Sequence, residues 1–496
     1  MILLYFLFVF LPFTGFLTGE ASLSDIWLNG RRLRLLANSG LLAFLSAGGC
    51  LFIGLFAALF IHNSFLRNRK GRWFFLLMAP VPYYIYALTW MYLIRFLGRA
   101  DRRLMSSAMT GLLPCVFVNI FAFLPVTAGL ILAAMEALDG RAEEMGTVYA
   151  GGNRVFFHII LPEILPALVG TGAFVFVLSI TDYSVPSLFQ FSTYTLEIFS
   201  RYSAGASLKE VGLLSLPLVS AALLLLLLML KSISSFSLRC RKGKKEGLKI
   251  TGGARGMGVL AFLLCILQIV IPVSMFLLHM ENWSNFISSV SLCAGELLSS
   301  LVMAALAAVT AVLPASFAGT EASKRGKWYA VLLLFPMAVP SSLIGMGLLR
   351  AVNGSAFHAL SRTVLFPAFG CAVKYMPFAA FLFAVQSRRI AKEELELGRI
   401  YAPDGRSFFW NILLPAYRPA LLGSLVLVFV LALGEESIAL ILMPPGCEML
   451  AVKVYNYLHY GASELVSGFS LLTVLVTGAL FFILFEMLQG KRRKGQ

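Results

Sequence analysis

Long runs of apolar residues, separated by short polar stretches, follow one another along the whole chain. A helix needs about 20 apolar residues to cross the hydrocarbon core of a bilayer, and helices are expected there because backbone amides have no water partner. The pattern predicts twelve membrane spans, near residues 2–18, 40–62, 73–94, 110–135, 167–190, 212–234, 257–279, 290–318, 329–349, 364–385, 420–443 and 466–487.

One polar stretch between predicted spans occurs twice. Residues 143–167 read EEMGTVYAGGNRVFFHIILPEILPA, and residues 395–420 read LELGRIYAPDGRSFFWNILLPAYRPA. Glu144 and Arg154 recur 252 residues later, and Pro162 recurs after 253, so one residue has been inserted between these points in the second copy. A polar loop repeated in an otherwise lipid-soluble chain indicates a function outside the membrane.

The repeat extends into the spans. Both the third and the ninth span carry two prolines, Pro80 with Pro82 and Pro336 with Pro340. Proline removes a helical hydrogen bond and kinks the span. The chain is therefore expected to be an all-α polytopic membrane protein made of two tandem six-helix units, with a pathway between them. The predicted division is a first unit at 1–238, a basic cytoplasmic linker at 239–256 and a second unit at 257–496.

Composition and charge agree with this class of protein. The chain is 59% hydrophobic, with a net charge of +16. Its basic residues fall in short runs beside spans, which is typical of cytoplasmic loops rather than of nucleic-acid binding. This rule places both repeated loops and both termini in the cytoplasm, in a multi-pass protein of the cell (inner) membrane whose first span is retained. If the predicted spans alternate in direction from a cytoplasmic N-terminus, two basic groups lie on the external side of the membrane. They are Arg31, Arg32 and Arg34, and the group Arg95, Arg99, Arg102 and Arg103.

Each repeated loop contains a short apolar stripe. Met145, Val148 and Tyr149 in the first copy are spaced i, i+3, i+4, as are Leu397, Ile400 and Tyr401 in the second. That spacing gives one apolar ridge on a short helix. The ridge could pack on the ends of its own spans or enter a groove of another protein, and its duplication favours docking to a partner.

The loops resemble those of type I permease subunits of binding-protein-dependent ATP-binding-cassette (ABC) importers, in the form that fuses two permease halves. Glu143 stands at the first Glu of the family's motif, and the residues before Pro162 and Pro415 fit its distal Ile-x-Leu-Pro. The chain departs from the motif at Met145, at Tyr149 and Tyr401 in place of the central Gly, and at Leu395 in place of the Glu. The resemblance implies that the loops couple to ATPase subunits through Glu143, Glu144, Met145, Gly146, Tyr149, Pro162, Glu396, Leu397, Gly398, Tyr401 and Pro415.

The same resemblance implies partners and excludes some activities. Two ATPase subunits and an extracytoplasmic solute-binding protein are expected, together with the lipid bilayer and no nucleic acid. The sequence contains no G-x-x-x-x-G-K-[ST] motif, so ATP is expected on a separate subunit, and the chain itself is expected to be no enzyme and to hold no cofactor. The misplaced group Arg95, Arg99, Arg102 and Arg103 is the candidate for docking the solute-binding protein.

Four ionisable residues are predicted inside spans, where a charge costs about 2.5–3.5 kcal/mol on insertion scales. They are Asp182, Lys374, Glu435 and Glu436. They could line the pathway for a cationic solute, with Lys374 as counter-ion, or form a structural ion pair. The segments around Asp182 and Glu435 resemble the branch of fused permeases associated with ferric iron, thiamine and polyamines. These features favour a cation or metal ion such as ferric iron as the solute, and no metal-ligand constellation of the chain itself is legible.

Two other functions remain open from the sequence. A secondary transporter also has two six-helix halves, and residues 98–103, GRADRR, faintly echo a basic motif of the major facilitator family. An integral-membrane enzyme would need clustered His or acidic residues at a cytoplasmic interface, and no such cluster is legible.

Overall fold

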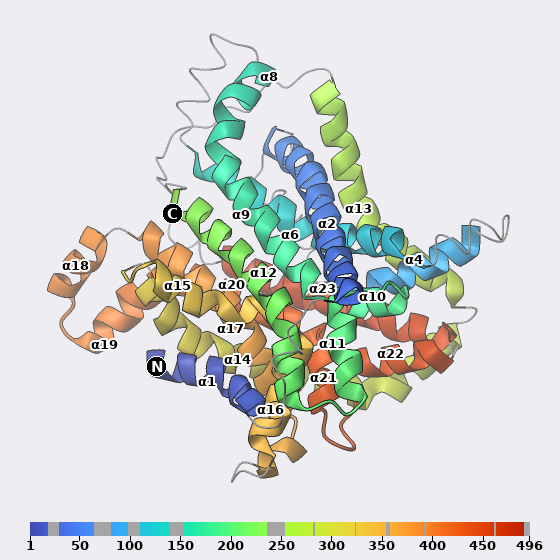
Figure 1. Cartoon of the computed structure of the whole chain (residues 1–496). Helices are drawn as coiled ribbons and strands as arrows, with labels where there is room; N and C mark the ends of the chain where they lie inside the picture. Colours follow the sequence, from blue (N-terminus) through green and yellow to red (C-terminus); the bar gives the residue numbers. More distant parts are fainter. Residues whose placement is uncertain are drawn as a thin grey trace. The chain divides into compact units, whose positions relative to one another are not determined.

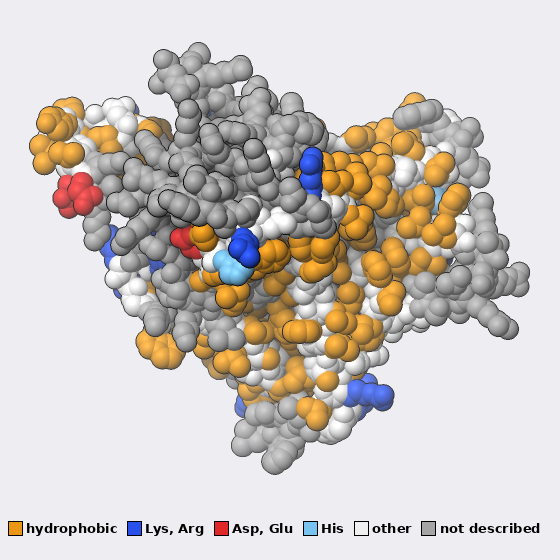
Figure 2. All heavy atoms as spheres, turned by 90° about the horizontal axis from the view of Figure 1, so that it is seen from above, with side chains coloured by type: hydrophobic (Ala, Val, Ile, Leu, Met, Phe, Trp, Pro, Cys, Tyr) orange, Lys and Arg blue, Asp and Glu red, His pale blue; other side chains and the backbone are white. Residues whose placement is uncertain are grey.

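The computed structural model describes residues 1–17, 29–63, 81–97, 110–138, 152–235, 253–280, 283–322, 324–353, 358–390, 392–460 and 463–490. Within these ranges the regular structure is helical and includes no β-strand. The prediction of an all-α polytopic membrane protein is confirmed. In the view of Figure 2, hydrophobic side chains cover most of the described surface and charged ones are few, as expected for a surface in contact with lipid.

Among the described residues, eight helices are long and apolar enough to cross a membrane. They are α2 (Gly30–Asn63), α6 (Leu112–Ala137), the run from α8 (Gly152–Val155) to α9 (Leu161–Ile180), α12 (Leu208–Ser235), α13 (Gly253–His279), α14 (Trp283–Ala322), α17 (Leu365–Arg389) and the run from α19 (Gly405–Phe408) to α20 (Leu414–Leu433).

The other predicted spans contain helices that are bent or shorter. One bent pair joins α15 (Lys327–Leu334) and η6 (Phe335–Ala338) to α16 (Ser341–Val352), and α1 (Ile2–Thr14), α4 (Tyr83–Leu97) and α23 (Ser463–Gly490) have shorter apolar described stretches. Every predicted span thus contains a helix, but the count of twelve is not confirmed. The bent pair turns by 93° between residues 338 and 341. The kink predicted from Pro336 and Pro340 is therefore confirmed, because neither proline can donate a helical hydrogen bond.

The internal repeat recurs in the order of elements, and its helices α8, α9, α19 and α20 are labelled in Figure 1. α8, the π-helical segment η5 (Phe156–Ile160) and α9 recur as α19, the π-helical segment η8 (Phe409–Leu413) and α20, each beginning 253 residues later. The next short helix, α10 (Ser184–Leu188), recurs at the same interval as α21 (Ser437–Leu442). The two copies thus share local structure as well as sequence.

The chain forms two compact units that are not continuous in sequence. One unit contains residues 1–19, 294–453 and 479–496, and the other contains 20–293 and 454–478. The N-terminal helix α1 therefore belongs to the unit built mainly from the second half of the chain, and α13 belongs to the unit built mainly from the first half. The predicted boundaries at 238 and 257 divide the sequence by its repeat and stay a prediction.

Specific contacts hold these exchanged helices. Tyr5 of α1 donates a hydrogen bond from its hydroxyl to the backbone carbonyl of Leu333, at 2.6 Å. Gly347 of α16 has no room for a Cβ, which would overlap the backbone of Pro12. In the other unit, a Cβ on Gly258 of α13 would lie 3.1 Å from the Cβ of Phe60 on α2. Glycine permits this close backbone approach between membrane helices.

Candidate functional site

The second repeated loop forms the short helix α18 (Lys392–Tyr401), which carries the predicted ridge. Leu397, Ile400 and Tyr401 are 53%, 75% and 81% exposed, respectively. Because these positions are spaced i, i+3, i+4, their side chains share one face of the helix. Three large apolar side chains are thus presented outward on a helix of ten residues.

The residues after α18 fix its position on the following span. Pro403, Asp404 and Gly405 end the helix, and the Asp404 carboxylate accepts a hydrogen bond from the backbone N–H of Ser407 at 2.8 Å, capping α19. Gly398 lies against Ile412, whose side chain a Cβ at Gly398 would approach within 2.8 Å. α18 is therefore seated directly on η8 through a glycine.

The guanidinium of Arg399 adds a second contact between α18 and the span. It lies over the ring of Phe408, 5.5 Å from the ring centroid. A cation at this distance from an aromatic face is attracted by the ring quadrupole. Both contacts lie on the inner side of α18, which leaves the ridge uncovered.

A proline explains the π-helical turn between loop and span in both copies. Pro162 and Pro415 stand at the second position of α9 and α20, directly after η5 and η8. A proline has no N–H for the carbonyl four residues earlier, and its ring would clash with that carbonyl in a regular α-helix. The wider π turn avoids this clash. The aromatic pairs Phe156–Phe157 and Phe409–Trp410 pack edge to face in the two π-helical segments.

The first loop is described only from residue 152 onwards. Pro162 lies in that part and is exposed. The predicted coupling residues of this copy that lie outside the described residues are Glu143, Glu144, Met145, Gly146 and Tyr149. In the second copy, the described Glu396 and Pro415 are both exposed, as expected for a loop at the protein surface.

The acidic residue Asp182 caps the short helix that follows its span. Its carboxylate oxygens accept hydrogen bonds from the backbone N–H groups of Ser184 at 3.1 Å and Val185 at 3.3 Å. Its backbone carbonyl accepts a hydrogen bond from the hydroxyl of Thr195 at 2.8 Å. Asp182 is half-buried, so the carboxylate satisfies two helix N-terminal donors and still has access to solvent.

Glu435, the equivalent residue of the second half, is more deeply enclosed. One of its oxygens accepts from the backbone N–H of Ile438 at 3.2 Å, which caps α21 as Asp182 caps α10. The other oxygen accepts from the hydroxyls of Tyr375 and Ser341. With only 2% of its surface exposed, Glu435 joins α16, α17 and α21 through three donors.

Lys374 and Glu436 are also buried in this unit. The ammonium of Lys374 donates a hydrogen bond at 2.6 Å to the backbone carbonyl of Val339, at the bend between η6 and α16. That carbonyl is available because Pro340 interrupts the helix. The structure therefore brings Lys374, Glu435 and the proline bend into one compact unit, with Lys374 bonded to the bend.

The arginine group proposed for binding-protein docking is described in part. Arg95 is exposed in the last turn of α4. Arg99, Arg102 and Arg103 lie outside the described residues. No group of three or more His, Cys, Asp or Glu side chains that could hold a metal ion occurs in the part of the chain that the structure describes.

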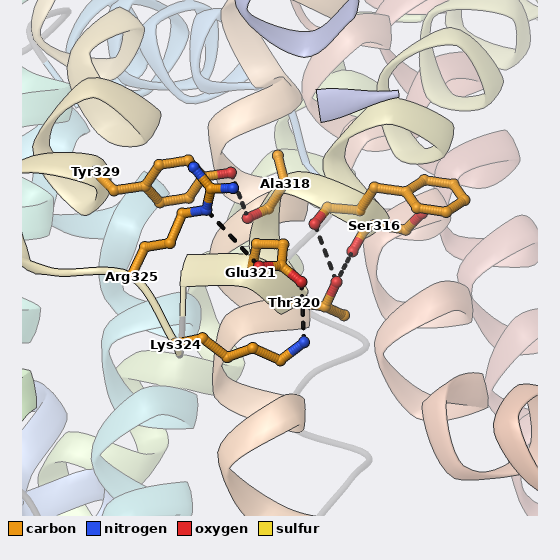
Figure 3. A network of polar contacts seen from close by, with 8 residues as sticks. Ser316, Ala318, Thr320, Glu321, Lys324, Arg325 and Tyr329 are labelled. Carbon is orange, nitrogen blue, oxygen red and sulfur yellow. Dashed lines mark hydrogen bonds and ion pairs between the residues drawn. The ribbon is translucent and has the colours of Figure 1, made fainter. Parts of the chain in front are cut away.

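A polar network closes the turn between α14 and α15, in the basic run expected to be cytoplasmic (Figure 3). Glu321 accepts from the ammonium of Lys324 at 2.9 Å and pairs with Arg325 at 3.7 Å. Arg325 also lies over the ring of Tyr329, whose hydroxyl donates to the Ala318 carbonyl at 3.1 Å. Positive charge at the C-terminal end of α14 is favourable to the helix dipole.

The sequence is similar to those of known transport proteins. Residues 311–494 match the family described as "Binding-protein-dependent transport system inner membrane component". The Fe(3+)-transport system permease protein FbpB 2 of Haemophilus influenzae is 22% identical, covering 97% of this chain and 94% of its own. A 2-aminoethylphosphonate transport system permease protein, PhnV, of Salmonella typhimurium is 23% identical, covering 49% of this chain and 97% of its own. The chain is therefore similar to the permeases of binding-protein-dependent ABC transporters, through the family match in its second half and through a relative that extends over both halves.

Proposed function

We propose that this chain is the fused permease of an ATP-driven importer, with separate ATPase subunits docked on its two repeated loops. The observation that carries the proposal is the outward ridge of α18, where Leu397, Ile400 and Tyr401 are exposed. Gly398 and Arg399 already make the contacts of α18 with the following span. A ridge that its own span does not cover suits a groove on a partner, as in other helix-in-groove complexes.

The ATPase is proposed to be a separate subunit because the chain contains no phosphate-binding loop motif. Closure of two such subunits would draw the two loops together and move the spans between outward-open and inward-open states. The loops and both termini would face the cytoplasm. A solute-binding protein would dock at the opposite face, where Arg95, Arg99, Arg102 and Arg103 are the proposed contacts.

The solute is proposed to be cationic or a metal ion such as ferric iron. A relative that extends over both halves is named for Fe(3+) transport, whereas the phosphonate permease matches only about half of this chain. The acidic residues Asp182, Glu435 and Glu436 lie near span ends or breaks in both halves. Thiamine, a polyamine or another small solute is the alternative.

The test is reconstitution of the purified chain in proteoliposomes with and without its co-expressed ATPase. Uptake should require the ATPase, ATP and the binding protein. The panel of solutes should include chelated ferric iron, 2-aminoethylphosphonate, thiamine and a polyamine. Uptake by the chain alone, driven by an ion gradient, would replace the proposal by a secondary transporter. Uptake of 2-aminoethylphosphonate without uptake of iron would keep the importer and reject the cationic solute.

A further inference from the structure

In each half, a short helix that follows the acidic residue is attached to the long second helix of that half. These short helices are α11 (Tyr194–Ser203) and α22 (Leu450–Tyr460). The first backbone N–H of α11, on Tyr194, donates to the hydroxyl of Ser39 on α2 at 2.9 Å. The first N–H of α22, on Leu450, donates to the hydroxyl of Ser300 on α14 at 2.8 Å. Such N–H groups have no partner inside their own helix, so the serine replaces a local cap.

A charged pair lies one turn further along each short helix. In α11, Glu197 accepts from Arg31 of α2 at 2.8 Å and also pairs with Arg201 of its own helix at 3.5 Å. In α22, Lys453 forms an ion pair with Glu296 of α14. Glu197 and Lys453 stand at the same position, three residues after the first residue of their helix. The two halves therefore use the same arrangement with opposite charges.

The two pairs differ in their access to water. In the first pair Glu197 is buried (7% exposed) but Arg31 is 74% exposed, whereas the side chains of Lys453 and Glu296 are 9% and 20% exposed. Salt screens a solvent-exposed pair and has much less effect on a partly buried one. Removing one partner of a buried pair also leaves an uncompensated charge behind. The pair of the second half should therefore be the stronger of the two.

The Arg31–Glu197 pair of the first half is connected to Asp182 through α11. Thr195 of α11 donates from its hydroxyl to the backbone carbonyl of Asp182, at 2.8 Å. The hydroxyls of Thr193 and Thr195 are 3.0 Å apart, and Asn38 of α2 donates to the Ser192 carbonyl at 3.0 Å. The position of Asp182 thus depends on α11, and the position of α11 depends on α2.

We propose that Glu197 and Lys453 are positioning residues that lock these short helices onto α2 and α14, and that release of the first lock exposes the acidic break at Asp182 for transport. The inference rests on the proposed transport function. Each half then has its own lock. The short helix carries the acidic partner in the first half and the basic partner in the second, and the second lock is the stronger. In the first half, opening the lock displaces Asp182 through Thr195.

Cysteine labelling of the purified chain in lipid nanodiscs tests the locks, because both faces are open to the reagent and neither ATPase nor solute is needed. In a background with Cys240→Ser and Cys447→Ser, Ile198→Cys reports on α11 and Val452→Cys on α22, since both native side chains are buried. Glu197→Gln should raise the labelling of residue 198 by about two- to fivefold, the range expected for a pair worth up to 1 kcal/mol. Molar NaCl should raise the labelling of residue 198 by a similar factor in the parent protein, and should cause no further increase in Glu197→Gln.

Matched variants separate the lock from a general effect of charge. Arg34 is an exposed arginine on α2 whose guanidinium has no hydrogen bond or ion pair with any described residue, so Arg34→Gln should leave labelling unchanged. Lys453→Met should raise the labelling of residue 452 by roughly tenfold or more, with little response to salt. Exposed Glu448→Gln, close to α22, is its control. The double variant Glu296→Lys with Lys453→Glu should return labelling to the parent rate.

The outcomes can be distinguished. Equal labelling in Arg34→Gln and Glu197→Gln, or failure of the charge-swapped pair to restore protection, would overturn the locks. If Lys453→Met does not accumulate, the charge-swapped variant still decides the question. Uptake that does not depend on an ATPase would reject the proposed function and leave the labelling results standing. If the locks hold, Glu197→Gln should raise the KM for the solute while the melting temperature stays at that of Arg34→Gln.

Discussion

Replacing Tyr375 by phenylalanine removes one of three donors to the buried carboxylate of Glu435. The others are the hydroxyl of Ser341 and the backbone N–H of Ile438. A hydrogen bond to a charged group contributes about 1.5–3 kcal/mol, and the carboxylate left behind cannot turn to water because it is 2% exposed. We therefore expect Tyr375→Phe to lower the free energy of unfolding by about 1.5–3 kcal/mol.

The size of the effect should depend on the charge of Glu435. In a Glu435→Gln background the same change removes a neutral bond, worth about 0.5–1.5 kcal/mol, so the double-mutant cycle should give a coupling of about 1 kcal/mol or more. Thermal unfolding of the purified protein in detergent measures all four proteins, with transport measured in parallel. Tyr417→Phe is the control, since its hydroxyl has no hydrogen bond with any described residue. Unchanged stability of Tyr375→Phe, combined with loss of transport, would refute this structural role of Glu435 and favour direct contact with the solute.

Three further changes test the loops and the exchanged helix. Leu397→Asp should abolish copurification of the ATPase, because a charge placed in an apolar groove is left unpaired, whereas Glu393→Gln at an exposed position outside the predicted coupling set should retain it; copurification of the Asp variant would reject docking on α18. Pro415→Ala should let η8 become a regular α-helix, and each residue by which the helix register then shifts would rotate α18 by about 100°. ATP hydrolysis should continue, with less solute transported per ATP. An unchanged number of solutes per ATP would contradict this role of the π turn. Gly347→Leu should lower the free energy of unfolding by about 1–3 kcal/mol through overlap with the backbone of Pro12, and an unchanged melting temperature would show that α1 does not pack there.

The helices and the repeat could be predicted from the sequence because both are local properties. Apolar run length placed a helix in every predicted span, and the proline pair at Pro336 and Pro340 marked the 93° bend. The i, i+3, i+4 spacing gave the exposed ridge of α18, because neighbours on one helix face depend only on helix geometry. Run length does not show whether a helix bends or is too short to cross the membrane, so the sequence predicted the positions of the helices but not the number of crossings.

The partners of the buried charges could not be predicted in the same way. The sequence offered Glu435 and Glu436 as partners for Lys374, but the hydrogen bond of Lys374 to Val339 depends on a carbonyl that the proline bend leaves available. The pairs Arg31–Glu197 and Lys453–Glu296 were missed because each joins elements more than 150 residues apart. Arg31 gave one signal, since it violates the charge rule for an external loop, but its carboxylate partner Glu197 lies 166 residues further along the chain.

The exchange of first helices sets the order in which the two units can be completed during synthesis. Tyr5 and its acceptor Leu333 are 328 residues apart, so at about 5–20 residues per second α1 waits about 15–65 seconds for its binding surface. The unit made mainly from the first half likewise stays incomplete until α13 has been translated. A ribosome that stops in the basic linker would therefore release neither unit in finished form, and cutting the gene there would yield two fragments that must exchange helices before either is whole.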